Sequence, residues 1–461
     1  MISERVLKEL SSILGPGHLT TRPEDLMTFG TDATKLRFMP DAVAFPGTAE
    51  EISKIFQLAN QERFPVIPRG AGSGKSGGAL PVEGGLILAM DRFNRILEID
   101  QHNLIARVEC GVITAAFQDA VEKVHLFYPP DPASIHISTL GGNVAECAGG
   151  LRAVKYGVTR DYVLGLAAVL PTGEIVKTGV QTIKGVVGYD LTRLLIGSEG
   201  TLAVVTEIVV RLIPKPAYRK TMMAFFKTAS ATVDTVSEII RSKIVPTALE
   251  FMDRTCITCV DEDVGLAVPE GTGALLLIEV DGDRALATKE AKKVEGICTR
   301  RGALEFCSAS RLKDSEKLWE ARRNVSQSVY KLRPDKISED IVVPRSRMAE
   351  FIGFLEVTAK TYDLPMAAYG HAGDGNIHVN ILFDQKSPGQ LEKAQASVRE
   401  LFTKVIDLKG TLSGEHGVGV TKAPFIEMEI SRSVLELMVR LKKAFDPNGI
   451  LNPGKIFPYK I

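Results

Sequence analysis

The sequence has little tryptophan, no excess of either charge and no long uninterrupted apolar run. Its 461 residues include one Trp, and 56 basic residues balance 56 acidic ones. The chain as a whole therefore exerts no electrostatic attraction on nucleic acid or anionic lipid, and any phosphate binding must be local. The lack of a run of about 18 apolar residues argues against a membrane-spanning helix, although docking to a membrane-bound partner stays open.

The first ten residues also lack the features of a targeting signal. They mix acidic with basic side chains in an amphipathic helical pattern, unlike an export or mitochondrial signal. We therefore expect a cytoplasmic protein, or one held peripherally at the inner face of the membrane by a partner.

Cysteine is too scattered to form a structural metal site. Among six cysteines only Cys256 and Cys259 lie close together, and no second pair completes a zinc or iron–sulfur site. We expect reduced thiols, because a redox-active Cys-x-x-Cys requires a low thiol pKa at a strand-to-helix turn. Without an iron–sulfur motif, electrons released by any redox reaction would have to leave through another molecule.

The length predicts two or three domains. Residues 41–214 alternate short β-type runs with helices, and Pro214-Lys-Pro216 cannot continue a strand ladder, so we place the end of a first domain at residue 216. Residues 217–425 form a second domain whose strand and helix patterns recur in βαββαβ, ferredoxin-like order. Residues 426–461, with a helical stretch at 435–445, form a C-terminal segment. The expected fold class is α+β.

A glycine loop, Pro68-Arg-Gly-Ala-Gly-Ser-Gly-Lys-Ser-Gly-Gly78, superficially matches two nucleotide-binding motifs. A Walker loop needs glycine where Arg69 stands, and a dinucleotide fingerprint needs a helix where Gly78-Ala-Leu-Pro81 would break one. Successive glycines nevertheless let backbone N–H groups approach an anion such as pyrophosphate. A flexible surface loop is the alternative.

A second stretch of small residues covers 132–150, and related glycine-rich and hydroxyl-rich segments follow at 152–163 and 197–202. Small side chains there would let a flat ring system lie against the backbone. The three segments together contain more glycine than a plain hydrophobic core requires.

Three of the seven histidines lie in two polar clusters near the C-terminus. His371 and His378 occur in Gly-His-Ala-Gly-Asp-Gly-Asn-Ile-His378, and Glu415 and His416 occur in Ser413-Gly-Glu-His-Gly417. Two imidazoles and a carboxylate are a ligand set for a catalytic divalent metal with an open position, which leaves His416 as a base. The alternative is a set of structural histidines.

Together these motifs resemble the FAD-linked D-2-hydroxyacid dehydrogenases, the group that holds D-lactate dehydrogenases and the glycolate oxidase flavin subunit. The resemblance extends from about Phe45 to Lys455. It implies a vanillyl-alcohol-oxidase type FAD-binding domain, a ferredoxin-like substrate cap domain and FAD as the cofactor. Because Ser73 replaces the His or Cys through which some relatives tether FAD, noncovalent binding is expected.

The resemblance also implies which residues contact the FAD. They are Arg69, Gly70, Ala71, Gly72, Ser73 and Gly74 at the pyrophosphate; Pro132, Ser134, Thr139, Gly142, Asn143, Ala145, Gly149, Tyr156 and Gly157 around the flavin and ribityl chain; and Gly200, Thr201, Val205 and Asn452 at the remaining edges. Cys147 stands where many relatives have Asn, which puts one polar contact in doubt.

For the reaction, the resemblance implies that a D-2-hydroxy acid is oxidised to a 2-oxo acid. A zinc or manganese ion held by His371, His378 and Glu415 would activate the hydroxyl, and His416 would take its proton while hydride passes to flavin N5. Residues expected to bind or orient the substrate are Arg322, Ser326, Asn380 and Lys336. Arg322 would clamp the carboxylate, unless Arg323 takes that role.

The electron acceptor is expected to be an electron-transferring flavoprotein, an iron–sulfur subunit or a quinone. Two other functions stay open. One is a flavin-binding electron-transfer subunit that oxidises no substrate of its own, and the other is an oxidase that uses oxygen. The length of the substrate side chain is not readable from the sequence.

Overall fold

The computed structural model describes residues 1–309 and 312–460. Within it the chain divides into two compact units, each continuous in space but not in sequence. The first unit contains residues 1–149, 158–215 and 415–461, and the second contains residues 150–157 and 216–414. The chain thus changes unit between Lys215 and Pro216, within the Pro214-Lys-Pro216 segment, although Pro214 itself still pairs with Leu126 of β7 at the edge of a short two-stranded sheet.

The return to the first unit occurs at Glu415, whereas the sequence pattern placed it at residue 426. The backbone N–H of Gly414 donates to Asp340 of the second unit, while those of Val418 and Gly419 donate to Glu199 of the first. No proline or change of hydrophobic period marks this point. The carboxylates of Asp340 and Glu199 fix the backbone on either side of Glu415. Both are far from residue 415 in the sequence, so these bonds leave no signal in the local sequence.

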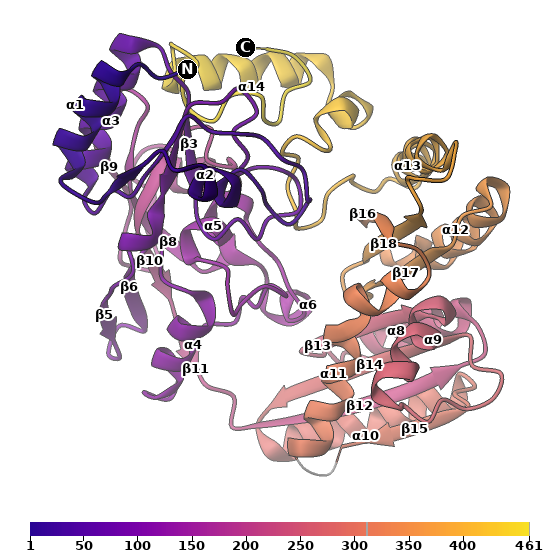
Figure 1. Ribbon diagram of the computed structural model, residues 1–461. Helices are drawn as coiled ribbons and strands as arrows, with labels where there is room; N and C mark the ends of the chain where they lie inside the picture. Colours follow the sequence, from indigo (N-terminus) through magenta and orange to yellow (C-terminus); the bar gives the residue numbers. More distant parts are fainter. Residues whose placement is uncertain (310–311, 461) are drawn as a thin grey trace. The chain divides into compact units, whose positions relative to one another are not determined.

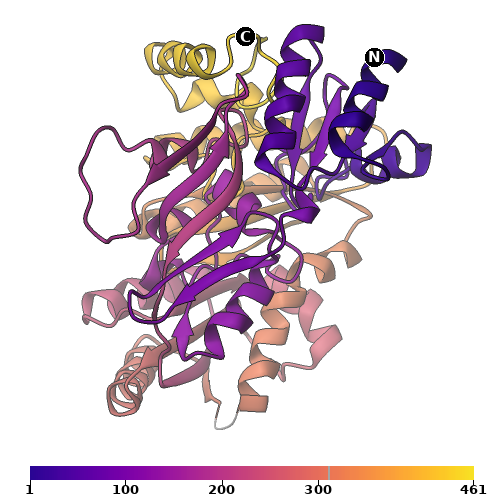
Figure 2. The ribbon, with the colours of Figure 1, turned by 90° about the vertical axis from the view of Figure 1, so that its left-hand side faces the viewer.

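The first unit contains two main sheets (Figures 1 and 2). A four-stranded sheet has the order β1 (Leu19–Thr20), β2 (Ala42–Ala44), β4 (Leu86–Ala89) and β3 (Val66–Arg69), in which β2, β4 and β3 are parallel. An antiparallel five-stranded sheet has the order β5 (Ile96–Asp100), β6 (Ile105–Glu109), β10 (Val204–Arg211), β8 (Val163–Val169) and β9 (Ile175–Gly179), and a short pair joins β7 (Leu126–Phe127) to β11 (Ile213–Pro214).

The helices of the first unit are α1 (Glu4–Leu14), α2 (Pro23–Phe29), α3 (Ala49–Glu62), α4 (Thr114–Glu122), α5 (Leu140–Glu146), α7 (Leu191–Leu195) and α14 (Arg432–Phe445). Helix α3 begins after the N-cap residue Thr48. Thr48 Oγ1 accepts the N–H of Glu51, but the Glu51 carboxylate accepts the N–H of Gly47, not that of Thr48. Between β9 and α7 the chain projects from the sheet as a long loop (Figure 2).

A buried lysine fixes the C-terminal segment to the first unit. Lys442 on α14 donates from Nζ to the carbonyl oxygens of Thr201 and Leu451 and to Oδ2 of Asp446, at 2.8, 2.7 and 2.6 Å. Asp446 in turn accepts the N–H groups of Ile450 and Leu451. Because each buried charge is paired and hydrogen-bonded, the segment that leads to Asn452 is held rigidly.

The second unit is one seven-stranded antiparallel sheet with helices on both faces (Figure 1). Its order is β15 (Glu305–Ser308), β12 (Tyr218–Phe226), β14 (Ala274–Gly282), β13 (Ala248–Asp253), β17 (Met366–His371), β18 (Asn376–Phe383) and β16 (Asp335–Val342). The helices are α6 (Ala153–Tyr156), α8 (Ala229–Arg241), α9 (Arg254–Val264), α10 (Arg284–Arg300), α11 (Leu312–Ser328), α12 (Met348–Tyr362) and α13 (Gln390–Asp407).

The first four strands in sequence confirm the predicted ferredoxin-like order. Strands β12 to β15 with helices α8 and α10 form the βαββαβ unit, and α9 is an additional helix that the sequence analysis did not predict. The remaining strands, with α12 and α13, repeat the arrangement as β16-α12-β17-β18-α13. Strand β13 of one half pairs with β17 of the other. One sheet therefore extends through both halves.

Candidate functional site

A cavity in the first unit is lined largely by backbone and small side chains. Its walls come from the glycine loop after β3, from the segment around α5, from the turn before β10 and from Glu415 and His416. The predicted cofactor-binding residues that line it are Arg69, Gly70, Ala71, Gly72, Ser73, Gly74, Pro132, Ser134, Thr139, Gly142, Asn143, Ala145, Gly149, Gly200 and Val205. The structure thus brings the separate glycine-rich segments to one cavity.

Two glycines are required by close approach of the cavity walls. A Cβ atom at Gly70 would lie 2.5 Å from Oγ1 of Thr139, and one at Gly141 would lie 2.6 Å from Cβ of Cys110. Thr139 is the N-cap of α5, and its Oγ1 accepts the N–H of Gly142. Larger residues would therefore displace the cap that shapes the cavity, which explains the glycine content.

Arg69 gives the cavity a buried positive charge. Its Nη2 donates to the carbonyl of Thr31 at 2.8 Å, whereas Nη1 is buried and has no hydrogen-bond partner among the described residues. Burial also lowers the pKa of Arg69 from its ordinary value. An unpartnered guanidinium donor beside backbone amides fits the pyrophosphate of a dinucleotide cofactor.

Two carboxylates in the same cavity, the half-buried Glu146 and the buried Glu199, were not predicted from the sequence. Burial raises the pKa of both Glu146 and Glu199, and for Glu146 the negative charge of Glu199 raises it further. Glu199 also accepts the N–H groups of Val418 and Gly419 at 2.8 and 2.6 Å. It therefore anchors the backbone that follows His416.

Four predicted cofactor-binding residues do not line the cavity. Thr201 bonds the carbonyl of Ser198, and Asn452 donates to the carbonyls of Gly78 and Glu199, so both support the cavity wall from behind. Tyr156 and Gly157 belong to the second unit, where the Tyr156 hydroxyl donates to Asp281. Tyr156 and Gly157 lie close in sequence to residues of the cavity, and this proximity gave no sign that Asp281 holds Tyr156 in the second unit.

Cys147 occupies a backbone position that favours asparagine. It ends α5 with φ 51° and ψ 47°, the left-handed region, and its Sγ accepts a weak bond from Nε of Arg160 at 3.0 Å. An Asn side chain tolerates this conformation better, and its amide oxygen is the stronger acceptor.

We therefore expect Cys147→Asn to stabilise the protein by about 1 kcal/mol. That corresponds to a rise of about 1–2 °C in the midpoint of thermal unfolding, measured by circular dichroism. Cys298→Ser, which alters a buried thiol on α10, is the control and should not raise the midpoint. A midpoint for Cys147→Asn at or below that of the unmodified protein would contradict this account.

The second unit brings His371 and His378 together. Their ring centroids lie 5.2 Å apart with the ring planes at 87°. His371 is the last residue of strand β17, because the strand continues to pair with β13 as far as Glu250. Nδ1 of His371 lies 2.8 Å from Oε1 of Glu250.

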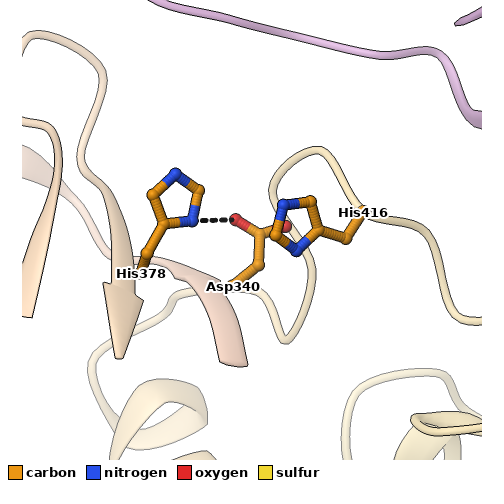
Figure 3. Close-up of side chains that lie close together, drawn as sticks. All are labelled: Asp340, His378 and His416. Atoms are coloured by element: carbon orange, nitrogen blue, oxygen red, sulfur yellow. Dashed lines mark ion pairs between the residues drawn. The ribbon is translucent and has the colours of Figure 1, made fainter. Parts of the chain in front are cut away.

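His378 and Asn380 lie two apart on strand β18 and therefore share a face. Nδ1 of His378 lies 3.5 Å from Oδ1 of Asp340, its direct partner on β16 (Figure 3). Asp340 also accepts from Nδ2 of Asn376 at 2.6 Å. Asn380 is fully buried, and its Oδ1 has no hydrogen-bond partner among the described residues.

The structure distinguishes Arg322 from Arg323. Arg322 is buried, donates from Nε to Oε2 of Glu250 at 2.7 Å and lies over the ring of Tyr369, with 4.8 Å from Cζ to the centroid. Arg323 is exposed and points to the carbonyl of Glu316. Only Arg322 of this pair is thus linked to the histidine cluster.

Ser326 and Lys336 are joined to each other. Lys336 on β16 donates from Nζ to the carbonyl and hydroxyl oxygens of Ser326 on α11, at 2.8 and 3.2 Å. Its ammonium group also lies 4.6 Å from the ring centroid of Tyr330. The two hydrogen bonds tie strand β16 to helix α11.

The sequence analysis missed Glu250 and Asp340. Each is a fully buried carboxylate that lies opposite a histidine in strand register, Glu250 opposite His371 and Asp340 opposite His378. A signal was present for Glu250, which interrupts the apolar run of residues 248–252, whereas Asp340 follows Ser338 and Glu339 and interrupts no apolar run. A carboxylate buried in a strand needs a hydrogen-bonding or charged partner that is also buried.

The cysteines play no part in this cluster. All six carry free thiols, as expected, and Cys256 and Cys259 are buried on α9. Burial raises the pKa of both thiols, so neither has the low value that a redox-active Cys-x-x-Cys requires. In the described part of the chain, no helix is long and apolar enough to cross a membrane.

Two family models match the chain. Residues 40–179 match an FAD binding domain, and residues 215–456 match the C-terminal domain of FAD linked oxidases. Among solved structures, p-cresol methylhydroxylase is similar with a TM-score of 0.84 at 18% identity, over 98% of this chain and 96% of that one. A 4-ethylphenol oxidase from Gulosibacter chungangensis has a TM-score of 0.78 at 19% identity, over 99% and 97%. The expected α+β, vanillyl-alcohol-oxidase type fold is confirmed.

Curated relatives match over nearly the whole chain. The glycolate oxidase subunit GlcD of Bacillus subtilis is 43% identical over 99% of this chain and 97% of its own length. A D-lactate dehydrogenase of Anaerostipes hadrus is 34% identical over 90% of this chain and 89% of its own. On these matches and the fold, the chain belongs to the FAD-linked D-2-hydroxyacid dehydrogenase family and is an FAD-dependent oxidoreductase.

Proposed function

We propose that the protein oxidises a small D-2-hydroxy acid, such as D-lactate or glycolate, to the 2-oxo acid. The observation that carries this proposal is the linked set in the second unit, where Glu250 joins the guanidinium of Arg322 to His371, which lies beside His378. To bind and activate a 2-hydroxy acid, a site needs a cation that pairs with the substrate carboxylate. It also needs ligands, such as two imidazoles, for a metal that activates the hydroxyl. Relatives named as a glycolate oxidase subunit and a D-lactate dehydrogenase support the substrate class.

Arg322 would hold the substrate carboxylate. Its Nε is engaged by Glu250, which leaves the two terminal nitrogens of the guanidinium for a bidentate contact. Asn380, with a buried Oδ1 that lacks a partner in the described chain, and the joined pair Ser326 and Lys336 would orient the rest of the substrate.

His371, His378 and Glu415 would hold a divalent metal, zinc or manganese. Nδ1 of each imidazole faces a buried carboxylate, an arrangement that directs Nε2 toward a cation. Glu415 directly follows Gly414, whose N–H donates to the same Asp340 that lies behind His378. When bound, the ion would supply Lewis acidity that lowers the pKa of the substrate hydroxyl.

His416 would take the hydroxyl proton. It lines the same cavity of the first unit as the glycine loop, and its Nε2 lies 3.9 Å from Oε1 of Glu415. The glycine loop with Arg69 and the segment around α5 would hold FAD in this cavity through noncovalent contacts, and the cofactor would supply a hydride acceptor for the reaction. The electrons would then pass to a separate flavoprotein, an iron–sulfur subunit or a quinone.

An anaerobic titration tests the proposal. Purified protein with FAD bound would be mixed with a panel of D- and L-2-hydroxy acids, and bleaching of the flavin absorbance would be recorded. We expect reduction by at least one short D-2-hydroxy acid or by glycolate, and slower or no reduction by L-enantiomers. A flavin that stays oxidised with every member of the panel would instead favour an electron-transfer subunit.

Arg322→Lys tests the carboxylate contact. Lysine keeps the charge but cannot make two parallel hydrogen bonds, so we expect KM for the hydroxy acid to rise about 10-fold or more. Arg323→Lys, at the exposed neighbour, is the matched control and should leave KM unchanged. Equal effects of the two substitutions in steady-state assays would remove Arg322 from the binding site.

A further inference from the structure

Glu250 stands at the centre of the polar cluster in the second unit, although no part of the sequence pattern marks it as functional. We propose that Glu250 is a positioning residue that couples the carboxylate-binding Arg322 to the metal ligand His371. The inference rests on the proposed function, because it takes these two residues as substrate and metal contacts. What is new is that the substrate contact of Arg322 and the metal contact of His371 both depend on one buried side chain, Glu250.

The geometry engages both oxygens of one side chain. Oε1 lies 2.8 Å from Nδ1 of His371, and Oε2 accepts the Nε–H of Arg322 at 2.7 Å. The Glu250 side chain is fully buried, and its backbone lies directly opposite His371 in the pairing of β13 with β17. With both oxygens used, the carboxylate plane is fixed, and it fixes the imidazole and the guanidinium in turn.

Each contact determines what its partner presents. A carboxylate at Nδ1 favours the imidazole tautomer that carries its proton on Nδ1, so that the lone pair on Nε2 is available to a metal. At Arg322, the bond through Nε and the ring of Tyr369 below the guanidinium prevent rotation of the planar group. The terminal nitrogens of Arg322 therefore keep one orientation relative to His371.

The positive charge of Arg322 is a second reason why position 250 requires a carboxylate. The buried guanidinium of Arg322 needs a negative partner before substrate arrives, because an uncompensated buried charge is strongly unfavourable. An amide of the same size would meet this need poorly. Glutamine has one acceptor oxygen and must turn its NH2 group toward either Arg322 or His371. The first choice loses the bond from Arg322, and the second makes Nδ1 of His371 an acceptor, which moves the imidazole proton to Nε2 and removes the lone pair that a metal would need.

Neighbouring carboxylates have different contacts and serve as comparisons. Asp340 lies behind His378 and accepts from Asn376 and Gly414. Glu279, on the adjacent strand β14, is also buried but accepts from Thr221 and from Nε1 of Trp319, one helical turn before Arg322 on α11. Glu279 therefore matches Glu250 in burial and in its contact with α11, without contacting the histidine cluster.

The experiment compares Glu250→Gln with Glu279→Gln in the full-length protein with FAD bound. Zinc content per flavin is measured by elemental analysis after equilibration at a series of buffered free zinc concentrations. For Glu250→Gln we expect zinc affinity about 10- to 100-fold weaker. The dissociation constant of oxalate, read from the perturbation of the flavin spectrum, should rise as well, whereas Glu279→Gln should change neither quantity.

A third variant separates positioning from folding. Glu250→Asp keeps the negative charge but is too short to reach both partners, so it should fold as the unmodified protein does and still weaken zinc binding or oxalate binding. Combined with Arg322→Lys, the effect of Glu250→Gln on oxalate affinity should be less than additive, because both act on one contact.

The outcomes distinguish this inference from the proposed function. If the unmodified protein binds zinc and is reduced by a hydroxy acid while both Glu250 variants keep its zinc and oxalate affinities, the coupling role is wrong and the function stands. If the unmodified protein binds no zinc and no tested hydroxy acid reduces its flavin, the proposed function fails first. Equal losses in the Glu250 and Glu279 variants would reduce Glu250 to a general packing role.

Discussion

Replacing His416 with alanine is expected to slow reduction of the bound flavin by D-lactate or glycolate by about 10²- to 10⁴-fold, the usual contribution of a general base. FAD should remain bound, because His416 is one of many residues that line the cavity of the first unit and the glycine loop with Arg69 is unchanged. The loss follows from chemistry. Without the imidazole, the hydroxyl proton must pass to water as the hydride leaves.

The rate is to be measured in a single anaerobic turnover by stopped-flow absorbance, so that reoxidation by any acceptor does not contribute. His102→Ala, at an exposed histidine in the turn between β5 and β6, is the control and should reduce at the unmodified rate. His416→Gln should resemble the alanine variant, because an amide cannot accept the proton. A normal rate in either His416 variant would exclude the proposed base.

Replacing His378 with alanine is expected to abolish metal binding at ordinary zinc or manganese concentrations. Flavin reduction should then fall more than about 100-fold, since Lewis-acid assistance contributes several kcal/mol to such a reaction. His378 is the better choice of the two strand histidines, because His371 shares Glu250 with Arg322 and its loss would disturb both contacts. Elemental analysis of metal per flavin is the direct measurement.

Chelation provides the companion experiment. Dialysis of the unmodified protein against a strong chelator should lower the rate of flavin reduction to a similar extent, and zinc or manganese should restore it. Added metal should not restore His378→Ala. If the variant retains a full equivalent of metal, or if chelated protein reduces at the normal rate, the histidines are structural and the metal proposal is lost.

Local signals in the sequence predicted the secondary structure well. Helix α3 follows the capping residue Thr48, the β8–β9 hairpin turns at Pro171-Thr-Gly173, and α14 begins within three residues of its predicted start at Leu435. Each of these depends on interactions between residues close in sequence, so the pattern of a few neighbours is enough. Helix α9 was not predicted, because its first turns consist largely of Thr, Cys, Ile and Val, residues with low helix propensity.

Long-range pairing was predicted less completely. The βαββαβ order of the second unit was readable because its strands recur with helical patterns between them, but the second half of the sheet was not. Its joining to the first half depends on the pairing of β13 with β17, strands separated by more than a hundred residues. The inclusion of residues 150–157 in the second unit has the same cause, because Lys155 and Tyr156 are held by Asp281.

The candidate groups for the proposed chemistry could be read from the sequence. Three candidate groups, the glycine loop after Pro68, the imidazoles His371 and His378, and Glu415 with His416, were visible because each is a set of particular residue types at short spacing. Only the tertiary structure decided which buried groups support them. It selected Arg322 over Arg323 and revealed Glu250 and Asp340, because a buried charge is defined by its partner across the sheet, and strand pairing brings together residues that the sequence keeps far apart.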